Sequence, residues 1–310
     1  TLTLPSAEGK GNLDVKGNLT LGESSANALT IAGDEGNISC GGNFTLNTTG
    51  SEFGMVEFDG MVQQTFSGNK ITVDSLVVSN TNSANTGTTD VIFDGDVDIV
   101  PGGVFNPLDG TVDADGTADG STFTMNSDAN GTARIATLDN TAGGSNVLGD
   151  ITFERYFPAV TDGASWLSVG NYVVGATYAE WTSSFGSAPL MFEWDETHVL
   201  VNNSTDNPTG ANAWTIVSSG TLEDADFGYL VYTASNATAT LSASGGYNTA
   251  DPNQALTFSN TASHGGGWHL LTNPYPSPIS GSEFLSDNAG LLSSYYMYNN
   301  GTDVFETDLT

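Results

Sequence analysis

Length, composition and charge already exclude several classes of protein. The chain has 310 residues, and five Lys and Arg stand against thirty-six Asp and Glu, which gives a formal net charge of -31 at pH 7. A chain with this charge repels phosphate and anionic lipid, which excludes binding to nucleic acid and to a membrane surface. With 38% apolar residues it can still fill a hydrophobic core. No apolar run reaches the 18 residues that would span a bilayer.

The N-terminal residues and the cysteine content bear on the compartment. No charged start followed by a short apolar run is present, so we expect a signal peptide to be absent or already removed. The single Cys40 cannot form an intrachain disulfide. The scarcity of Lys favours an extracellular protein in saline water over a cytosolic enzyme.

Two composition shifts near residue 155 predict a domain boundary there. All five Lys and Arg precede Tyr156, whereas every Trp and Tyr lies at or after this position. We therefore predict one domain over residues 1–155 and a second over residues 156–310.

The first half contains an internal repeat. Six copies of a turn glycine followed by alternating apolar and polar residues begin at Gly17, Gly42, Gly68, Gly95, Gly120 and Gly149. Alternation with period two is typical of a strand with one buried face, and tandem copies of 20 to 30 residues favour a solenoid. We predict an all-β protein that begins with a right-handed parallel β-helix. One apolar column should hold Leu19, Phe44, Ile71, Val97, Phe123 and Ile151.

The same repeat makes a local prediction about the cysteine. A spacing of 25 residues places Cys40 opposite Val15, so Cys40 is expected to be a small buried hydrophobe. A reactive thiol is the alternative.

The second half lacks this period and instead shows short strands between turn clusters. The segments 166–174, 190–194, 214–218, 229–233, 239–243, 255–259, 268–272 and 295–298 are expected to be strands. This pattern predicts a β-sandwich, with one short helix within residues 282–292 and a hairpin around Asn299-Asn300-Gly301. The chain stops just after this hairpin, so the sandwich could be incomplete at its C-terminus.

Several segments then resemble a known group of proteins. They are GDITFERYFPA (149–159), FGYLVYT (227–233), TLSASGGYNT (240–249), GGGWHLLTNPYPSPIS (265–280) and YYMYNNGT (295–302). Together with the preceding solenoid, they resemble large surface proteins of Bacteroidota that are exported by the type IX secretion system. The resemblance implies a secreted adhesin or structural protein of the cell surface, with no catalytic residues to carry over. The usual C-terminal sorting domain of such proteins is missing here.

The resemblance also implies one modification site. The triplet Asp74-Ser75-Leu76 is similar to the short O-glycosylation signal of that phylum, with Ser75 as the modified residue.

Acidic loops are candidates for calcium binding. Asp113, Asp115 and Asp119 are spaced at short intervals among glycines, as oxygen ligands of a hard cation are, although the run lacks the late Glu of an EF-hand. An ordinary turn rich in Asp is the alternative. Glu223, Asp224 and Asp226 form a second candidate. No other cofactor is expected.

The competing hypothesis is that the chain binds or cleaves carbohydrate. Trp181 and Trp194 are each flanked by polar residues, so they are the tryptophans expected to be exposed and able to stack on sugar rings. Every second residue from Asp94 to Asp98 is an aspartate, so the three side chains, those of Asp94, Asp96 and Asp98, share one face of a strand. Paired carboxylates of this kind could be the catalytic residues of a hydrolase. The alternative is an ordinary outer face that is exposed to solvent. Neither a phosphate-binding loop nor a Gly-x-Ser-x-Gly motif occurs.

The sequence therefore favours a non-enzymatic extracellular protein with a structural or adhesive role. Self-association into a filament, or contact with other surface proteins or glycans, is expected. Thr1–Pro5 alternates like a strand and could be added to a neighbouring copy. The alternative is a carbohydrate-binding module or a polysaccharide-active enzyme on a β-helix scaffold.

Overall fold

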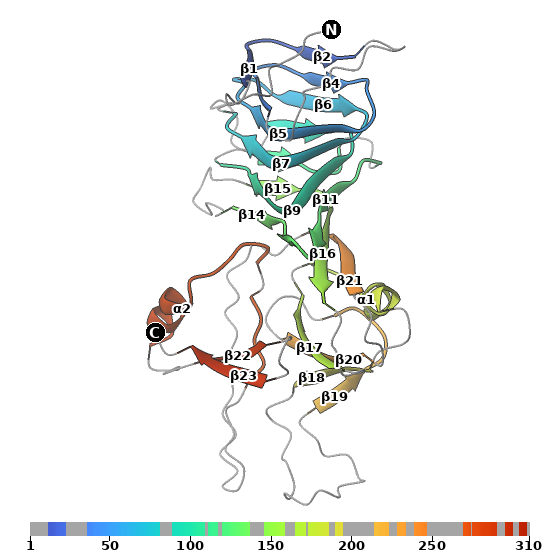
Figure 1. Cartoon of the computed structure of the whole chain (residues 1–310), viewed down its shortest axis with the longest axis vertical. Coiled ribbons are helices and arrows are strands. Elements are labelled where there is room, and N and C mark those ends of the chain that lie inside the picture. The colour runs from blue at the N-terminus through green and yellow to red at the C-terminus, as the bar shows by residue number, and fades with distance from the viewer. Residues whose placement is uncertain are drawn as a thin grey trace, which may run out of the picture. The chain divides into compact units, whose positions relative to one another are not determined.

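The structure is a computed structural model that is mostly β and contains parallel sheets (Figure 1). It describes residues 12–22, 36–80, 89–108, 111–116, 120–136, 146–158, 165–171, 173–185, 190–194, 214–222, 228–233, 239–246, 269–273, 275–289, 295–299 and 304–308. The chain divides into two compact units, Thr1–Tyr156 with Ser242–Gly246 and Phe157–Leu241 with Tyr247–Thr310. The all-β prediction is confirmed.

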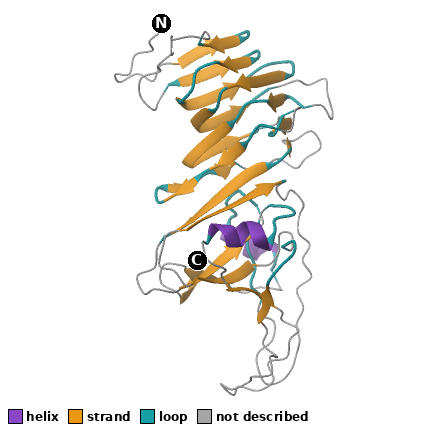
Figure 2. Ribbon diagram, turned by 90° about the vertical axis from the view of Figure 1, so that its right-hand side faces the viewer, coloured by secondary structure: helices purple, strands orange, loops and turns teal. Residues whose placement is uncertain are grey.

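Two large sheets, in which most strands pair in parallel, and one short hairpin make up the described part of the first unit (Figure 2). One sheet has the order β1 (Asn12–Val15), β3 (Asn37–Cys40), β5 (Ser51–Phe58), β7 (Ile71–Val78), β9 (Val97–Asn106), β11 (Phe123–Met125), β16 (Ile151–Phe157) and β21 (Ala239–Gly245), with β14 (Arg134–Ile135) paired to β9. The other has the order β15 (Asn146–Leu148), β10 (Thr111–Asp113), β8 (Val91–Phe93), β6 (Gln64–Gly68), β4 (Phe44–Leu46) and β2 (Leu19–Leu21). A short hairpin joins β12 (Ser127–Asp128) to β13 (Gly131–Thr132).

Successive strands from β1 to β11 alternate between the two sheets. Odd-numbered strands belong to the first sheet and even-numbered strands to the second, and each strand pairs with the next member of its own sheet. Leu13 pairs with Ile38, and Val15 pairs with Cys40, as the 25-residue spacing predicts. Cys40 is fully buried, which confirms its predicted place in the core.

The prediction of one apolar column with six members is wrong. Leu19 pairs with Phe44 in the six-stranded sheet, and the next residue in that column is Phe66. Ile71 instead begins a column in the nine-stranded sheet, where it pairs with Val97, which pairs with Phe123. Turn glycines precede strands of both sheets, and the number of residues between paired strands varies, so a glycine-based repeat does not identify the sheet.

An aromatic core fills the space between the two sheets. Ring centroids lie 5.5 Å apart for Phe44 and Phe66, 5.5 Å for Phe58 and Phe93, and 5.5 Å for Phe93 and Phe123. Phe58 belongs to one sheet and Phe93 to the other, so edge-on aromatic contacts join them. Burial of these inward columns is the main source of stability available to the unit.

The chain returns to the first unit after leaving it. Residues 242–246 belong to this unit, and β21 is the neighbour of β16 in its sheet. The Thr152 hydroxyl donates to the Ser244 hydroxyl at 3.2 Å. The sequence predicts this strand but assigns it to the second domain, because composition does not reveal which sheet a late strand joins.

The described strands of the second unit form two antiparallel sheets. The larger has the order β17 (Ser165–Gly170), β20 (Gly228–Thr233), β18 (Leu190–Trp194) and β19 (Trp214–Val217). The smaller is the predicted hairpin, β22 (Tyr295–Asn299) with β23 (Val304–Asp308). The two-layered sandwich stays a prediction.

The described part of this unit contains two short helices. Helix α2 (Gly281–Asp287) lies near the start of the segment expected to be helical. Helix α1 (Tyr178–Ser184) was not expected. Neither described helix is long and apolar enough to cross a membrane.

Candidate functional site

Side chains at the turns link successive strand pairs of the first unit. The Asn18 side-chain oxygen accepts from the Asn43 backbone N–H at 2.9 Å, and the Asn43 oxygen accepts from the Thr65 N–H at 3.0 Å. These Asn residues follow the turn glycines of the repeat, so the Gly-Asn pattern serves stacking. Each bond satisfies a backbone donor at the beginning of the next strand.

Asp96 and Asp98 have similar structural partners. Asp96 Oδ1 accepts from the Thr122 N–H at 2.8 Å and from the Thr122 hydroxyl at 3.0 Å. Asp98 Oδ2 lies 2.6 Å from Lys70 Nζ, and hydrogen bonding to this carboxylate raises the pKa of Lys70. Both carboxylates therefore have partners within the fold, and the solvated outer face and the hydrolytic pair both stay predictions.

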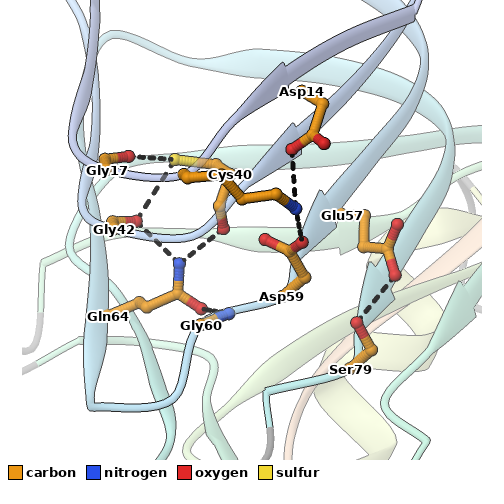
Figure 3. A network of polar contacts seen from close by, with 10 residues as sticks. Asp14, Gly17, Cys40, Gly42, Glu57, Asp59, Gly60, Gln64 and Ser79 are labelled. Carbon is orange, nitrogen blue, oxygen red and sulfur yellow. Dashed lines mark hydrogen bonds and ion pairs between the residues drawn. The ribbon is translucent and has the colours of Figure 1, made fainter.

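Gln64 is fully buried and forms several hydrogen bonds within the first unit (Figure 3). Its amide nitrogen donates to the carbonyls of Cys40 and Gly42, each at 2.7 Å. Its oxygen accepts from the Gly60 N–H at 2.9 Å and from the Asn80 side chain at 2.9 Å. Gln64 therefore joins three successive turns, a role that sequence reasoning missed because a lone Gln carries no periodic signal.

Cys40 and Lys16 lie beside this network. The Cys40 thiol donates to the Gly42 carbonyl at 3.2 Å, and burial raises the pKa of this thiol, which disfavours the reactive thiolate. Lys16 Nζ lies 2.9 Å from an Asp14 oxygen and 3.2 Å from an Asp59 oxygen. The hydrogen bonds that Lys16 donates to these two carboxylates raise the pKa of Lys16.

The candidate calcium loop is described only in part. Asp113 and Asp115 are close enough for their side chains to hydrogen bond, whereas Asp119 lies outside the described residues. Burial, followed by the contact with Asp115, raises the pKa of Asp113. Asp115 Oδ2 also accepts from the Asp150 N–H at 3.2 Å. Across the described parts of the chain, no three His, Cys, Asp or Glu side chains gather in a group that could hold a metal ion.

The second acidic cluster and the glycosylation site both stay predictions. Glu223, Asp224 and Asp226 lie outside the described residues. Ser75 lies in β7, where it pairs with Met55 and Val104, and its residue is half-buried. Its glycosylation stays a prediction.

Trp181 is not an exposed sugar-binding residue, which corrects the prediction. It lies in α1, its exposed fraction is 2%, and its ring packs edge-on against Tyr229 at 5.7 Å. The polar neighbours Glu180 and Thr182 suggested exposure, but in a helix adjacent residues point in different directions. Trp181 therefore packs on the face of the four-stranded sheet that carries Tyr229, together with the buried Leu167, Val169, Met191 and Val231. The same face also carries Glu193, Thr215 and Val217, which are half-buried or exposed.

Trp194 has a different environment. It is half-buried, lies opposite Trp214 in the strand register, and its ring centroid is 4.8 Å from that of Trp214. Because side chains alternate between the two faces of a sheet, the register defines which residues share its face. This aromatic face, as we call it, carries Trp166, Leu190, Phe192, Trp194, Trp214, Ile216, Leu230 and Tyr232, together with Ser168, Gly170 and Gly228.

Ring contacts along the aromatic face support this assignment. The Trp166 centroid lies 4.9 Å from that of Tyr232 and 5.6 Å from that of Phe192. All of these rings are half-buried, while Leu190 and Ile216 keep exposed fractions of 50% and 59%. Of the five aromatic residues, the sequence singled out only Trp194 as exposed, because the pairing of strands distant in sequence decides which rings meet.

No protein-family model, curated protein or solved structure matches this chain.

Proposed function

We propose that the chain is a non-enzymatic extracellular protein with a structural or adhesive role at the cell surface. In this proposal the first unit is a right-handed parallel β-helix and the second a β-sandwich domain. The resemblance to secreted type IX substrates of Bacteroidota supports this proposal. Calcium bound by Asp113, Asp115 and Asp119, the last of which lies outside the described residues, belongs to the same proposal.

The observation that carries the proposal is the continuous strand pairing of the first unit. Strands β1 to β11 alternate between two sheets and pair in parallel with the next member of each. Turn side chains such as Asn43 and Gln64 add bonds between neighbouring turns. A fold whose stability is a sum of neighbour contacts suits an extended scaffold that holds a binding domain away from a surface.

The first strand pair supports self-association. Among the described residues, β1 and β2 each pair with a strand on one side only. Leu13 and Val15 are half-buried, whereas their partners Ile38 and Cys40 are fully buried. A strand edge with apolar side chains beside it is a surface that another strand can cover. The segment Thr1–Pro5, which we expect to act in this way, lies outside the described residues.

Negative-stain electron microscopy and sedimentation velocity test the self-association. We expect the full chain to form filaments in saline buffer, and we expect Leu13→Lys and deletion of residues 1–5 to abolish them. Gln63→Lys is the matched control, because it adds the same charge at an exposed turn. Single particles under all conditions, with and without calcium, would overturn the filament, as would filaments of Leu13→Lys.

Carbohydrate binding is the second candidate function, and the aromatic face favours it. Half-buried aromatic rings on one sheet face are a surface suited to stacking on sugars. An enzymatic role has less support, because Asp96 and Asp98 are engaged by Thr122 and Lys70.

A further inference from the structure

We infer that β19 (Trp214–Val217) pairs with β19 of a second copy of the chain, so that two four-stranded sheets join edge to edge in a symmetric dimer. The inference goes beyond the proposed function. It does not depend on the first strand pair, because it concerns a different sheet in the second unit.

The first step is that β19 is an edge strand with exposed side chains. It ends the order β17-β20-β18-β19, and β18 is the one described strand that pairs with it. Thr215 and Ile216 lie on opposite faces of the sheet, and both are exposed, Ile216 by 59%. The residues Leu270 and Thr272 lie beside Gly228 of β20 and Gly170 of β17, toward the opposite edge of the sheet.

The second step is that β19 lacks the features by which edge strands usually avoid pairing. Its sequence Trp-Thr-Ile-Val contains no Lys, no Pro and no acidic residue. Its register with β18 is regular over all four residues, so no bulge turns the strand away. The free side of such an edge presents backbone N–H and C=O groups with which another strand can form a ladder.

The third step is that the strand is complementary to itself, which identifies the partner as a second copy. Opposite residues of an antiparallel pair lie on the same face, so Thr215 can lie opposite Thr215 of the second copy. Trp214 then lies opposite Ile216 of the second copy, and the two-fold axis repeats this contact. Pairs of Thr with Thr and of aromatic with β-branched residues are favourable across strands. Both exposed Ile216 side chains would be covered by an indole ring.

Charge sets the conditions under which the copies pair. Each copy has a net charge of -31, so two copies repel one another at low salt. Glu193 of β18 lies opposite Thr215, and the two Glu193 side chains of the dimer would be three strand spacings apart, roughly 14 Å. This separation exceeds the Debye length of about 8 Å at 0.15 M salt. We therefore expect the dimer in saline buffer and its loss at low ionic strength.

The length of the ladder sets the expected affinity. Four residues from each copy bury less area than a stable interface usually does. The dissociation constant should therefore lie in the micromolar range, and the dimer should depend on protein concentration.

Single cysteines test both the pairing and its register. Thr215→Cys places two thiols opposite one another at the two-fold axis, whereas Ile216→Cys places them a diagonal step apart, too far for a disulfide. Ser219→Cys is the matched control, because Ser219 is exposed and lies beyond the end of β19. Cys40 is fully buried, so the wild-type chain should form no cross-link.

The measurement is oxidation of each variant with oxidised glutathione in 0.5 M NaCl, followed by electrophoresis without reductant. We expect Thr215→Cys to give severalfold more cross-linked dimer than Ile216→Cys or Ser219→Cys. The cross-link should decrease when the same oxidation is carried out in 10 mM NaCl.

Sedimentation velocity measures the dimer without cross-linking. It uses the Leu13→Lys chain, in which we expect no filaments. A further Ile216→Asp substitution should weaken dimerisation about tenfold or more, whereas Ser219→Asp, which adds the same charge at an exposed position outside the strand, should not. Thermal melts of each variant establish that it is folded.

Three outcomes would overturn the inference. They are a monomer at every salt concentration, cross-linking of Ile216→Cys or Ser219→Cys equal to that of Thr215→Cys, and equal weakening by Ile216→Asp and Ser219→Asp. Failure of this inference can be told apart from failure of the filament proposal. A cross-linked Thr215→Cys dimer without filaments contradicts only the self-association of the first strand pair, and filaments without this cross-link contradict only the dimer.

Discussion

At the scale of single residues, the buried polar side chains of the first unit matter most. Gln64, Asn80 and Asp90 are all less than 9% exposed and lie in or beside the same set of turns. Buried polar groups stabilise a fold only when their hydrogen bonds are made. These residues therefore fix how neighbouring turns stack.

Replacement of Gln64 tests this role. Gln64→Leu should lower the free energy of unfolding by about 2–4 kcal/mol, because the Gly60 N–H loses its acceptor in the core and the Cys40 and Gly42 carbonyls each lose one of their donors. Urea denaturation measures the change. Gln63→Leu is the control, since Gln63 is exposed, and it should cost less than about 1 kcal/mol. Equal effects of the two variants would contradict the role.

Asp90 gives a prediction for pH. Burial raises the pKa of Asp90, although the Thr111 N–H that donates to its Oδ2 at 2.8 Å opposes the shift. A raised pKa in the folded state means that the stability contributed by the bound proton is complete below about pH 3.9, the unperturbed Asp value. This contribution is lost as pH rises through the higher folded pKa.

Asp90→Asn removes this titration. Relative to wild type, the variant should therefore gain stability as pH increases from about 4 to 7. Urea midpoints across this range measure the difference. Glu52→Gln, which removes one charge from an exposed position of β5, corrects for the change in net charge. A constant difference between Asp90→Asn and wild type would show that Asp90 is not responsible.

At the scale of elements, turn glycines set the distance between paired strands. A Cβ on Gly42 would lie 2.6 Å from the Asn18 backbone nitrogen, whereas a Cβ on Gly17 would meet nothing within 4 Å. The two glycines are equivalent in the sequence repeat and differ only in what lies next to them.

Alanine variants separate these two positions. Gly42→Ala should lower the free energy of unfolding by about 1–3 kcal/mol, because the turns must move apart. Gly17→Ala should be close to neutral. Thermal or urea unfolding distinguishes them, and equal loss in both variants would mean that backbone freedom, rather than stacking distance, explains the repeated glycine.

Helix α1 begins with a capping pattern that can be recognised in the sequence. Thr177 accepts from the Glu180 N–H at 3.3 Å, and Glu180 accepts from the Thr177 N–H at 2.7 Å, which together form a capping box. The Thr-x-x-Glu pattern that predicts such a box is present in the sequence. This pattern favours a helix that begins at Tyr178 and includes Trp181.

At the scale of the whole molecule, the charge of -31 dominates. Repulsion among carboxylates disfavours the compact state, and the Debye length falls from about 30 Å at 0.01 M salt to about 3 Å at 1 M. The melting temperature should therefore rise by several degrees between 10 mM and 0.5 M NaCl. Scanning calorimetry checks this, and an unchanged melting temperature would contradict it.

Calcium adds a separate prediction. At matched ionic strength, calcium should stabilise the chain beyond the effect of NaCl, and Asp115→Asn should remove the extra gain. Glu52→Gln should retain it, because Glu52 is exposed on β5 and removal of its charge changes no proposed ligand. Equal stabilisation by both salts would leave the acidic turn as a structural element and overturn the calcium site.

The sequence by itself determined the features that depend on local periodicity. Alternation with period two revealed the strands, the 25-residue spacing placed Cys40 opposite Val15, and Asn-Asn-Gly located the hairpin of β22 and β23. These features follow from residues close in the chain, where backbone preference and side-chain alternation act directly.

Only the tertiary structure decided which strands meet. Unequal segment lengths put Ile71 in a different sheet from Phe44, and β21 joined a sheet of the first unit. Trp166, Phe192 and Trp214 come together through strand pairing over long separations, while Trp181 is buried against Tyr229. Such contacts depend on which surfaces can be buried together in three dimensions, and no local pattern of residues records that choice.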